Sequence, residues 1–446
     1  MKLTWITLYK IIFNPLSTGL LAPFVLCSRK ARESLLAHVG LFRRVKQNLE
    51  QNSSDRPTFW VHVASAGEYL QAKPLVQMLL KKKYRVFLTV TSISGYRWLQ
   101  RQQANPSKNH KGNNKKNNKD SKDKNKESNL IFDFLPLDFS HNARKMLDLV
   151  NPAALIFVKT DIWPNLLGLA QKRDIPRILV CAGKRNAGSG LKRSFYKFLY
   201  GGFSAIFTVN GEGEKFFRTL LKEETFIKTV GDSKYDIVME RKKERSLRLP
   251  SIKSADTCAL FGSVWPEDLK VIARPVLNAL ENFPKLKIIV APHENHDKKV
   301  LELLELFKVY EPVLFSSLGK TKGGYKTPFR VMIVDTIGDL FYLYENSSVS
   351  YVGGGFSTGI HNILEPCSWK NTVIFGPRHQ KFPEAQNLLL KNCAQSIQNT
   401  TEFEKAFNEL LADKKLRLKK GRDCLDFVTH NTGASQKMFA DIIKMV

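Results

Sequence analysis

Along most of the chain, short runs of β-branched and aromatic residues alternate with longer segments in which apolar residues recur every three or four positions. The short runs predict buried strands and the longer segments predict helices. In the first half we predict strands at residues 58–65, 85–91, 131–137, 153–159, 177–181, 205–209 and 226–230. In the second half we predict strands at 258–264, 286–291, 331–334, 349–352 and 372–375, followed by a helical tail from Glu402. Strands separated by helices predict parallel sheets with both faces covered.

A chain of 446 residues is too long for one hydrophobic core and predicts two domains. The alternation is interrupted by a polar, basic run, and we predict a linker at residues 240–254. The first domain then covers residues 31–239, and the second covers residues 255–446 with the C-terminal helices. Together they predict an α/β fold of two Rossmann-like domains facing each other across a cleft. Ligands should bind at the carboxyl ends of the strands.

Two segments depart from this pattern. Residues 106–128 are rich in lysine and asparagine and cannot bury enough apolar surface, so we predict a disordered surface insertion there. Residues 1–27 are apolar and aromatic but are interrupted by Lys10, Asn14 and Pro15. The interruption argues against a signal peptide and against a simple spanning helix, which needs about 20 apolar residues. We predict that residues 1–30 are a tilted or interfacial membrane anchor; the alternative is a buried N-terminal helix pair.

The composition narrows the class of partner. A formal net charge of +29 predicts anionic partners, and nucleic acid, an acidic membrane surface and phosphorylated substrates all fit. The hydrophobic share of 43% is ordinary for a folded, soluble body. The 6 cysteines are scattered without a Cys-x-x-Cys pair, which argues for reduced thiols in the cytoplasm and against a zinc site or a disulfide framework.

The chemistry centres on residues 351–366 (YVGGGFSTGIHNILEP). An apolar lead-in runs into three glycines at positions 353–355, then into a polar turn and an apolar segment. This order predicts a strand, a glycine-rich loop and a helix N-terminus, where backbone N–H groups can face an anion. A glycine cluster alone more often only packs a helix against a sheet. Asn362 and Glu365, three residues apart on one helical face, add groups that suit a ribose and a base, so we favour a nucleotide site.

Further polar residues follow predicted strands at the same edges. Glu68 comes directly after the first strand, where a carboxylate can accept a proton from a hydroxyl or can only complement the helix dipole. Lys234 follows the last strand of the first domain, where it can pin a phosphate or be one more solvated lysine. The equivalent loops of the second domain contain Gly262–Ser263, Ala291–Glu294, Asp335–Asp339 and Gly376–Gln380.

No Asp-x-Asp pair occurs in the sequence. Transferases whose donor carries a diphosphate often hold a divalent metal with such carboxylates. Its absence favours a transferase that uses basic groups and helix N-termini instead. We therefore expect no metal and no cofactor.

Several motifs together resemble the Kdo transferases of lipopolysaccharide synthesis, which attach 3-deoxy-D-manno-octulosonic acid (Kdo) to lipid A precursors. The resemblance implies a GT-B glycosyltransferase that inverts configuration without a metal. It also implies that the N-terminal half binds the acceptor and the C-terminal half binds CMP-Kdo. The motifs, whose order and spacing cover nearly the whole chain, are Ala64–Glu68, Trp163–Asn165, Gly231–Asp236, Asp335–Asp339, Gly353–Pro366 and Gly376–Pro377.

On this resemblance Glu68 matches the general base, which deprotonates a glucosamine hydroxyl of the acceptor, and Lys234 matches a basic residue that stabilises the transition state. One departure is Lys159, which stands where many members carry glutamate, whereas Asp161 keeps the second acidic position. We therefore assign no catalytic role to position 159. Residues 291–294 (APHE) also differ from the more usual Pro-Arg-His. The residues that we assign to the CMP-Kdo site are Ser263, Pro292, His293, Ile337, Gly338, Asp339, Gly354, Asn362, Ile363, Leu364 and Glu365.

The expected partners are CMP-Kdo, a lipid A precursor (lipid IVA) and the acidic surface of the inner membrane, with the enzyme on its cytoplasmic face. Breaking the sugar–phosphate bond develops negative charge on the departing CMP, which fixed dipoles and cations stabilise. One alternative is a GT-B transferase that uses another nucleotide sugar. A basic nucleic-acid-binding protein is the alternative from another class, but the stacked aromatics and repeated basic faces of such modules are not evident. We therefore expect no nucleic acid partner.

Overall fold

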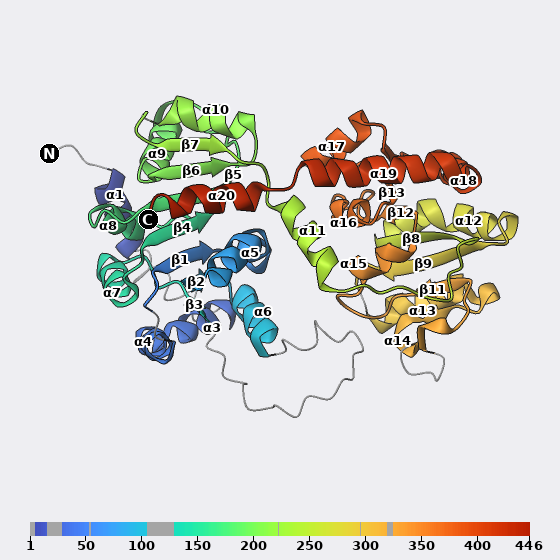
Figure 1. Cartoon of the computed structure of the whole chain (residues 1–446), viewed down its shortest axis with the longest axis horizontal. Helices are drawn as coiled ribbons and strands as arrows, with labels where there is room; N and C mark the ends of the chain where they lie inside the picture. The colour runs from blue at the N-terminus through green and yellow to red at the C-terminus, as the bar shows by residue number, and fades with distance from the viewer. Residues whose placement is uncertain are drawn as a thin grey trace. The chain divides into compact units, whose positions relative to one another are not determined.

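The computed structural model describes residues 5–15, 29–52, 55–104, 129–221, 223–294, 296–318 and 324–446. It divides into two compact units, Met1–Ile237 with Thr432–Val446, and Val238–Asn431. Each unit contains one seven-stranded parallel sheet. Helices surround each sheet, as Figure 1 shows. The predicted α/β fold with two Rossmann-like domains is confirmed. The predicted insertion at residues 106–128 lies outside the described residues.

The first sheet has the strand order β3-β2-β1-β4-β5-β6-β7, so the order reverses between β1 and β4. Apolar residues dominate β1, β4 and β6, and every residue of these strands is buried because helices cover both faces. The strands are β1 (Thr58–Val63), β2 (Arg85–Val90), β3 (Leu130–Phe134), β4 (Ala154–Val158), β5 (Arg177–Ala182), β6 (Ala205–Thr208) and β7 (Phe226–Thr229).

Two hydrophobic clusters hold the helices of this unit on opposite faces of the sheet. One face packs against α5, α6 and α20, and the other packs against α4, α7, α8, α9 and α10. The helices are α1 (Trp5–Pro15), α3 (Arg29–His38), α4 (Leu41–Gln51), α5 (Ala66–Lys81), α6 (Ile93–Ala104), α7 (Ser140–Val150), α8 (Pro164–Gln171), α9 (Gly190–Tyr200), α10 (Gly211–Leu220), α11 (Lys234–Glu244) and α20 (Ala434–Ile443).

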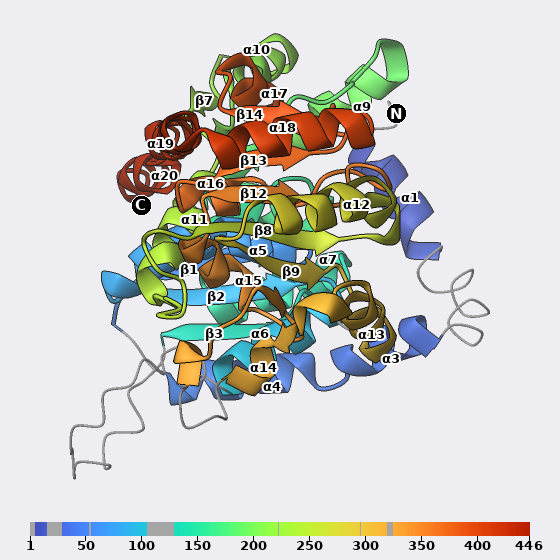
Figure 2. The ribbon, with the colours of Figure 1, turned by 90° about the vertical axis from the view of Figure 1, so that its right-hand side faces the viewer.

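The second sheet has the order β10-β11-β9-β8-β12-β13-β14 and reverses between β8 and β12. Helices α12 and α18 lie side by side over one face (Figure 2). Edge strands β10 and β14 were not predicted, because they have only two and three residues. The strands are β8 (Thr257–Val264), β9 (Leu286–Pro292), β10 (Val313–Leu314), β11 (Val331–Ile333), β12 (Val349–Val352), β13 (Thr372–Phe375) and β14 (Ala394–Ser396). The helices are α12 (Pro266–Asn282), α13 (Asp297–Leu306), α14 (Phe315–Leu318), α15 (Leu340–Leu343), α16 (Leu364–Ser368), α17 (Pro383–Leu390), α18 (Thr400–Ala412) and α19 (Lys414–His430).

Helix α20 belongs to the first unit, which corrects the prediction that the second domain runs to residue 446. Its apolar residues Ala434, Met438 and Ile442 are buried in the cluster that contains α5. The carboxylate of Asp236 accepts hydrogen bonds from the backbone N–H groups of Gly433 (2.5 Å) and Ser435 (2.7 Å) at the start of α20. These bonds satisfy donors that a helix N-terminus leaves open, so Asp236 anchors α20.

The predicted linker at residues 240–254 also needs correction. Residues 240–244 continue α11, and the division between the two units falls within this helix, after Ile237. The chain that follows is bound to the second unit. Glu345 accepts hydrogen bonds from the Ser246 hydroxyl (2.7 Å) and the Leu247 N–H (2.9 Å). The polar run predicts a free connector from sequence alone, because its polar groups find their partners about 100 positions away.

Asp236→Ala should lower the free energy of unfolding by about 1–2 kcal/mol, because two backbone donors at the start of α20 lose their acceptor. Denaturant unfolding measures this change. The matched control is Asp441→Ala, also on α20, which removes the ion pair between Asp441 and Lys228 of β7 (2.7 Å). That pair is partly exposed, and we expect its loss to cost less than about 1 kcal/mol. Equal effects of the two variants would contradict the anchoring role of Asp236.

The predicted membrane anchor is only partly described. Residues 5–15 form α1, whereas residues 1–4 and 16–28 lie outside the described residues. Within the described ranges, none of the helices is both long enough and apolar enough to cross a bilayer.

Candidate active site

The carboxyl edge of the first sheet brings several predicted residues together where the strand order reverses. Ligands of doubly wound folds bind in the crevice at this switch point. Glu68 lies in the first turn of α5, directly after β1, and Asp161 follows the neighbouring strand β4. The topology therefore puts both carboxylates at the position expected for a reacting group.

Glu68 is oriented by the start of its own helix. Ser65 is the N-cap, and its hydroxyl accepts the Glu68 N–H (3.4 Å), while Glu68 Oε2 accepts the Ala64 N–H (2.7 Å). Glu68 lies in the first turn, where a carboxylate complements the helix dipole as considered from sequence, but its hydrogen bond to Ala64 occupies only one carboxylate oxygen. The other oxygen, Oε1, has no hydrogen bond to any described residue. A carboxylate held in this way can still accept a proton through Oε1.

Beside Glu68, a chain of hydrogen bonds runs from the core to Asp161. The Trp60 indole N–H donates to Thr89 Oγ1 (2.9 Å), and Thr89 Oγ1 lies 3.0 Å from His62 Nδ1. The Asp161 carboxylate can only accept, so His62 Nε2 donates to Asp161 Oδ2 (3.1 Å). In the neutral imidazole, His62 Nδ1 then accepts from the Thr89 hydroxyl. The Thr91 hydroxyl also donates to Asp161 Oδ2 (2.6 Å). Sequence reasoning missed this network because His62 looks like one polar residue within an apolar strand.

The network determines the charge of Asp161. Burial alone would raise the pKa of this carboxyl, but hydrogen bonds from His62, Thr91 and Trp163 outweigh burial and hold its pKa below the ordinary value. A carboxyl whose pKa falls on folding stabilises the folded state above its unfolded pKa of about 3.9. This contribution is lost as the pH falls through the lowered value. Asp161 is therefore an anion at the switch point at neutral pH.

Thr89→Val should lower the free energy of unfolding by about 2–3 kcal/mol, because the Trp60 N–H and His62 Nδ1 are left without partners in a buried site. Urea unfolding measures the change. The matched control is Thr91→Val, which removes one partly buried bond to Asp161 and should cost about 1 kcal/mol. A Thr89→Val protein as stable as Thr91→Val would show that the chain of hydrogen bonds is not coupled.

Lys234 lies nearer to the switch point than β7, the edge strand that precedes it in the chain. After β7 the chain turns back across the edge, because Ser233 Oγ lies 3.3 Å from Cys181 Sγ at the end of β5. Strand β5 is two strand spacings from β1, roughly 10 Å. The Lys234 ammonium lies 3.5 Å from Asp232 and 5.5 Å from the Tyr235 ring centroid. Lys234 is therefore held by its own loop on the same edge as Glu68.

Lys159, the departure from the family pattern, lies between these residues at the end of β4. It adopts a left-handed conformation (φ 60°), and its N–H donates to the Val180 carbonyl (3.0 Å). Burial raises the pKa of the neighbouring Cys181 thiol to about 12, and the Lys159 charge opposes this rise only in part. Position 159 thus contributes a cation where an acid was expected, and Asp161 is the anion next to it.

In the second unit, the switch point between β8 and β12 is organised by Asp268, which the sequence analysis missed. This buried carboxylate accepts hydrogen bonds from the Trp265 N–H (2.8 Å), the Gly354 N–H (2.8 Å) and the Tyr351 hydroxyl (2.8 Å). It connects the loop after β8 to the glycine-rich loop after β12. A proline at the first helical position with an acid two residues later is a helix-start signal that could have revealed Asp268.

The glycines pack the loops together, which corrects the expectation that their N–H groups face an anion. A Cβ on Gly353 would lie 2.2 Å from the Ser263 carbonyl oxygen, and a Cβ on Gly355 would lie 2.5 Å from the Gly376 Cα. Gly354 adopts φ 89°, and its N–H donates to Asp268 instead of facing an open site. Backbone contact between loops, which was considered the commoner role of a glycine cluster, therefore accounts for Gly353 and Gly355.

Three rings line the same edge. Trp265 stacks on His293 with centroids 4.0 Å apart, and the His293 and His361 rings are 4.6 Å apart. The Trp265 indole N–H donates to His361 Nε2 (2.9 Å). Burial and the neighbouring His293 lower the pKa of His361. Of these rings only His293 was predicted, and its exposed ring gives the site a flat polar surface.

The remaining predicted residues gather around two arginines of the segment that was read as a linker. One Arg241 guanidinium nitrogen lies 3.3 Å from Glu365 Oε1, and the other donates to the Gly338 carbonyl (3.3 Å). Arg245 pairs with Asp339 (2.9 Å). The two arginines therefore bind two segments that are distant in sequence, Gly338–Asp339 and Glu365, and they explain why this basic run is present.

The remaining residues that we assigned to the CMP-Kdo site differ in how deeply their side chains are buried. Burial raises the pKa of Glu365, opposed by Arg241 and Asn362. Ile363 and Leu364 are buried, so their side chains belong to the core. Ile337 is 91% exposed, and Pro292 ends β9 half-buried. The described residues contain no group of three or more His, Cys, Asp or Glu that could hold a metal ion.

Comparison with known proteins agrees with this architecture. Residues 38–237 match the family described as 3-deoxy-D-manno-octulosonic-acid transferase (kdotransferase). The chain is 26% identical over 414 residues to a protein of that name from Rickettsia typhi, covering 90% of this chain and 82% of the relative. It is 27% identical over 358 residues to one from Aquifex aeolicus, covering 80% of this chain and 86% of the relative.

The fold is also found among solved structures. A crystal structure of a glycosyltransferase from Rickettsia africae is similar with a TM-score of 0.52 and 11% identity, covering 88% of this chain and 100% of that chain. At this identity the likeness concerns the fold, and the family match supplies the class of enzyme. The chain is therefore a glycosyltransferase of the two-domain GT-B fold, and its residues 38–237 match the Kdo transferase family.

Proposed function

We propose that this protein transfers Kdo from CMP-Kdo to a hydroxyl of a lipid A precursor at the cytoplasmic face of the inner membrane. The observation that carries the proposal is that residues 38–237, the part of the chain that matches the Kdo transferase family, contain Glu68 at the switch point of the first sheet. The high net charge of +29 suits a phosphorylated acceptor and an acidic membrane surface.

In the proposed reaction the acceptor hydroxyl attacks the anomeric carbon of Kdo from the face opposite CMP. Glu68 Oε1 takes the hydroxyl proton as the new C–O bond forms. The bond between Kdo and the phosphate breaks, and its electron pair leaves with CMP. Negative charge grows on that phosphate, and Lys234 is the cation that we assign to stabilise it. No metal is required, because the donor carries a single phosphate.

We assign recognition of CMP to the carboxyl edge of the second sheet. Glu365 and Asn362 supply an acceptor and a donor for the ribose hydroxyls, and Arg241 holds Glu365 in place. The exposed His293 ring, stacked on Trp265, suits a contact with the phosphate or a planar group. Asp268 keeps the two loops of this edge in register, so it acts by positioning other residues.

A transfer assay with the purified chain tests the proposal. CMP-Kdo is generated in situ and offered with a tetraacylated lipid A precursor, and the product is identified by its mass increase of one Kdo unit or more. In parallel, UDP- and GDP-sugars are offered with the same acceptor. Product from CMP-Kdo alone is the expected result. Product from another nucleotide sugar, with none from CMP-Kdo, would overturn the proposed donor and keep the glycosyltransferase class.

A further inference from the structure

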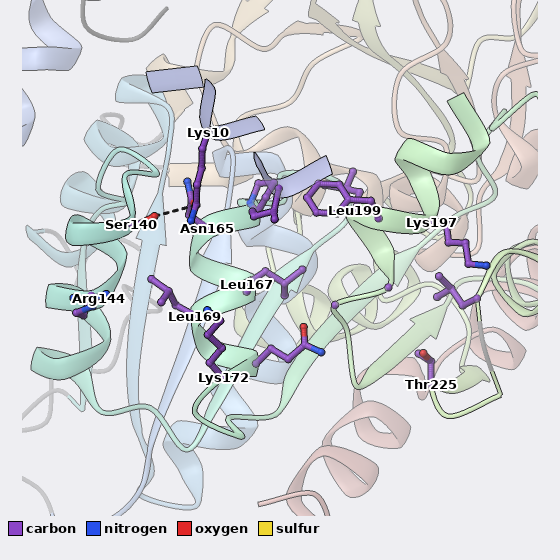
Figure 3. A pocket seen from close by; sticks show the side chains of 18 of the residues that line it. Lys10, Ser140, Arg144, Asn165, Leu167, Leu169, Lys172, Lys197, Leu199 and Thr225 are labelled. Atoms are coloured by element: carbon purple, nitrogen blue, oxygen red, sulfur yellow. Dashed lines mark hydrogen bonds between the residues drawn. The ribbon is translucent and has the colours of Figure 1, made fainter. Parts of the chain in front are cut away.

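A pocket of about 860 Å³ lies on the first unit along α8, bordered by α1, α7 and α9, as Figure 3 shows. This volume is in the range of small-molecule sites. The pocket belongs to the sheet face that carries α7, α8 and α9, whereas Glu68 begins α5 on the opposite face. It extends from Pro164 at the start of α8 to Gly202 and Thr225, which precede β6 and β7. The proposed reaction uses none of its residues.

The walls of the pocket are connected by hydrogen bonds, of which those between Asp138 and the start of α8 are buried. Asp138 accepts the Asn165 and Leu166 N–H groups at the start of α8 (2.8 and 3.0 Å). The Tyr9 hydroxyl of α1 donates to the same carboxylate (3.0 Å), and Trp5 of α1 donates to Ser194 of α9 (2.8 Å). Helix α1 is thereby joined to both sides of the pocket. The Trp-Pro-Asn motif has a structural role here, because Asn165 and Pro164 start α8 and line the pocket.

Gly168 leaves part of this space open. It lies inside α8, where glycine is unfavourable because of its backbone entropy. A Cβ built on Gly168 meets nothing within 4 Å, so no close packing requires glycine there. A side chain at this position would instead enter the pocket that Gly168 lines. A bulky substitution at this position therefore obstructs the pocket without a change in charge.

The lining combines an apolar floor with a cationic rim. The floor contains Ile6, Leu167, Leu169, Phe198, Leu199 and Leu221. Four basic residues line the pocket against one acid, Glu224. In Figure 3, Arg144 and Lys197 lie on opposite sides, with Leu167, Leu169 and Lys172 of α8 between them.

From this lining we infer that the pocket binds an acidic phospholipid of the bilayer, with one acyl chain along α8 and the phosphate at the basic rim. The apolar floor matches hydrocarbon, because each buried CH₂ group of an acyl chain favours binding. The excess of basic residues complements an anionic headgroup. A free phosphate would leave the apolar floor exposed to water, and a nucleotide would place polar groups against it. Lipid binding at this pocket does not depend on the transfer reaction.

The first test measures lipid bound to the full chain by native mass spectrometry in detergent, with phosphatidylglycerol and phosphatidylcholine offered separately. We expect the wild type to retain one phosphatidylglycerol, with at least tenfold preference over phosphatidylcholine. Gly168→Trp places an indole ring in the pocket along α8, where the acyl chain is proposed to lie, and should lower retention at least tenfold. The matched control Gly168→Ala adds only one methyl group to open space and should bind as the wild type does. Unchanged lipid binding by a folded Gly168→Trp variant would overturn the proposal.

A second test keeps the pocket open and changes its charge. Lys172→Gln with Lys197→Gln removes two basic rim residues and should weaken phosphatidylglycerol binding about 30-fold. Lys414→Gln with Lys415→Gln makes the same charge change at exposed positions of α19, and we expect wild-type binding. Equal loss in both pairs would indicate nonspecific attraction and overturn the site. Displacement of the lipid by inorganic phosphate alone, or stoichiometrically by the lipid A precursor, would also overturn it.

Discussion

Glu68→Gln should lower the rate of Kdo transfer about 10³-fold while the protein stays folded and still binds CMP. The glutamine amide oxygen can accept the Ala64 N–H in place of Glu68 Oε2, so the start of α5 is preserved. The amide cannot take the proton of the acceptor hydroxyl, so only the general base is lost. The turnover rate at saturating CMP-Kdo and acceptor measures the effect, and calorimetric titration with CMP checks donor binding.

Glu68→Ala is the comparison that separates chemistry from structure. It loses both the base and the cap, and we expect an additional loss of about 1 kcal/mol in the free energy of unfolding. Glu68→Gln should unfold within about 0.5 kcal/mol of the wild type. If Glu68→Gln turned over at more than a tenth of the wild-type rate, Glu68 would not be the base. Asp161, the other carboxylate at this switch point, would then be tested next.

Asp268→Ala should lower the free energy of unfolding of the second unit by roughly 3–5 kcal/mol and abolish CMP binding. Three donors, the Trp265 N–H, the Gly354 N–H and the Tyr351 hydroxyl, lose a buried acceptor together. The glycine-rich loop then has no fixed position relative to the loop after β8. Urea unfolding and titration with CMP measure the two effects.

Tyr351→Phe is the matched control for this prediction, because it removes the hydroxyl donor itself and leaves no buried donor without an acceptor. We expect it to cost about 1 kcal/mol and to keep CMP binding within a few fold of the wild type. An Asp268→Ala protein that unfolds within 1 kcal/mol of the wild type would contradict the view that this carboxylate holds the loops in register.

The predicted strands and the edge on which the site residues lie follow from local pattern. Each apolar run became a strand, because a segment buried on both faces needs continuous hydrophobic residues wherever it lies in the chain. Glu68, Lys234 and His293 follow strands in the sequence and therefore lie at carboxyl edges in the fold, and Ser263 is the second-last residue of β8. A polar residue that directly follows a predicted strand can therefore be assigned to the carboxyl edge from the sequence alone.

Local pattern was not sufficient for the residues that hold these groups in place. Asp268 and Gly354 are 86 positions apart, and Asp236 and Ser435 are 199 apart, so no periodicity reports their hydrogen bonds. The glycines at 353–355 were expected to expose N–H groups, yet Gly353 and Gly355 accommodate neighbouring loops. Arg241 and Arg245 looked like linker charges until Glu365 and Asp339 were brought beside them.

The amino-acid pattern therefore specifies a two-domain parallel α/β enzyme with reacting groups after its strands, because strand burial and edge position depend on neighbours in the chain. The folded chain decides which carboxylate takes part in chemistry and which holds a loop. Glu68 keeps one oxygen without a partner among the described residues, whereas both oxygens of Asp268 are occupied. It also decides that α20 joins the first unit and that α8 lines a pocket. These outcomes depend on which distant groups meet, since a polar group removed from water is stable only with a partner.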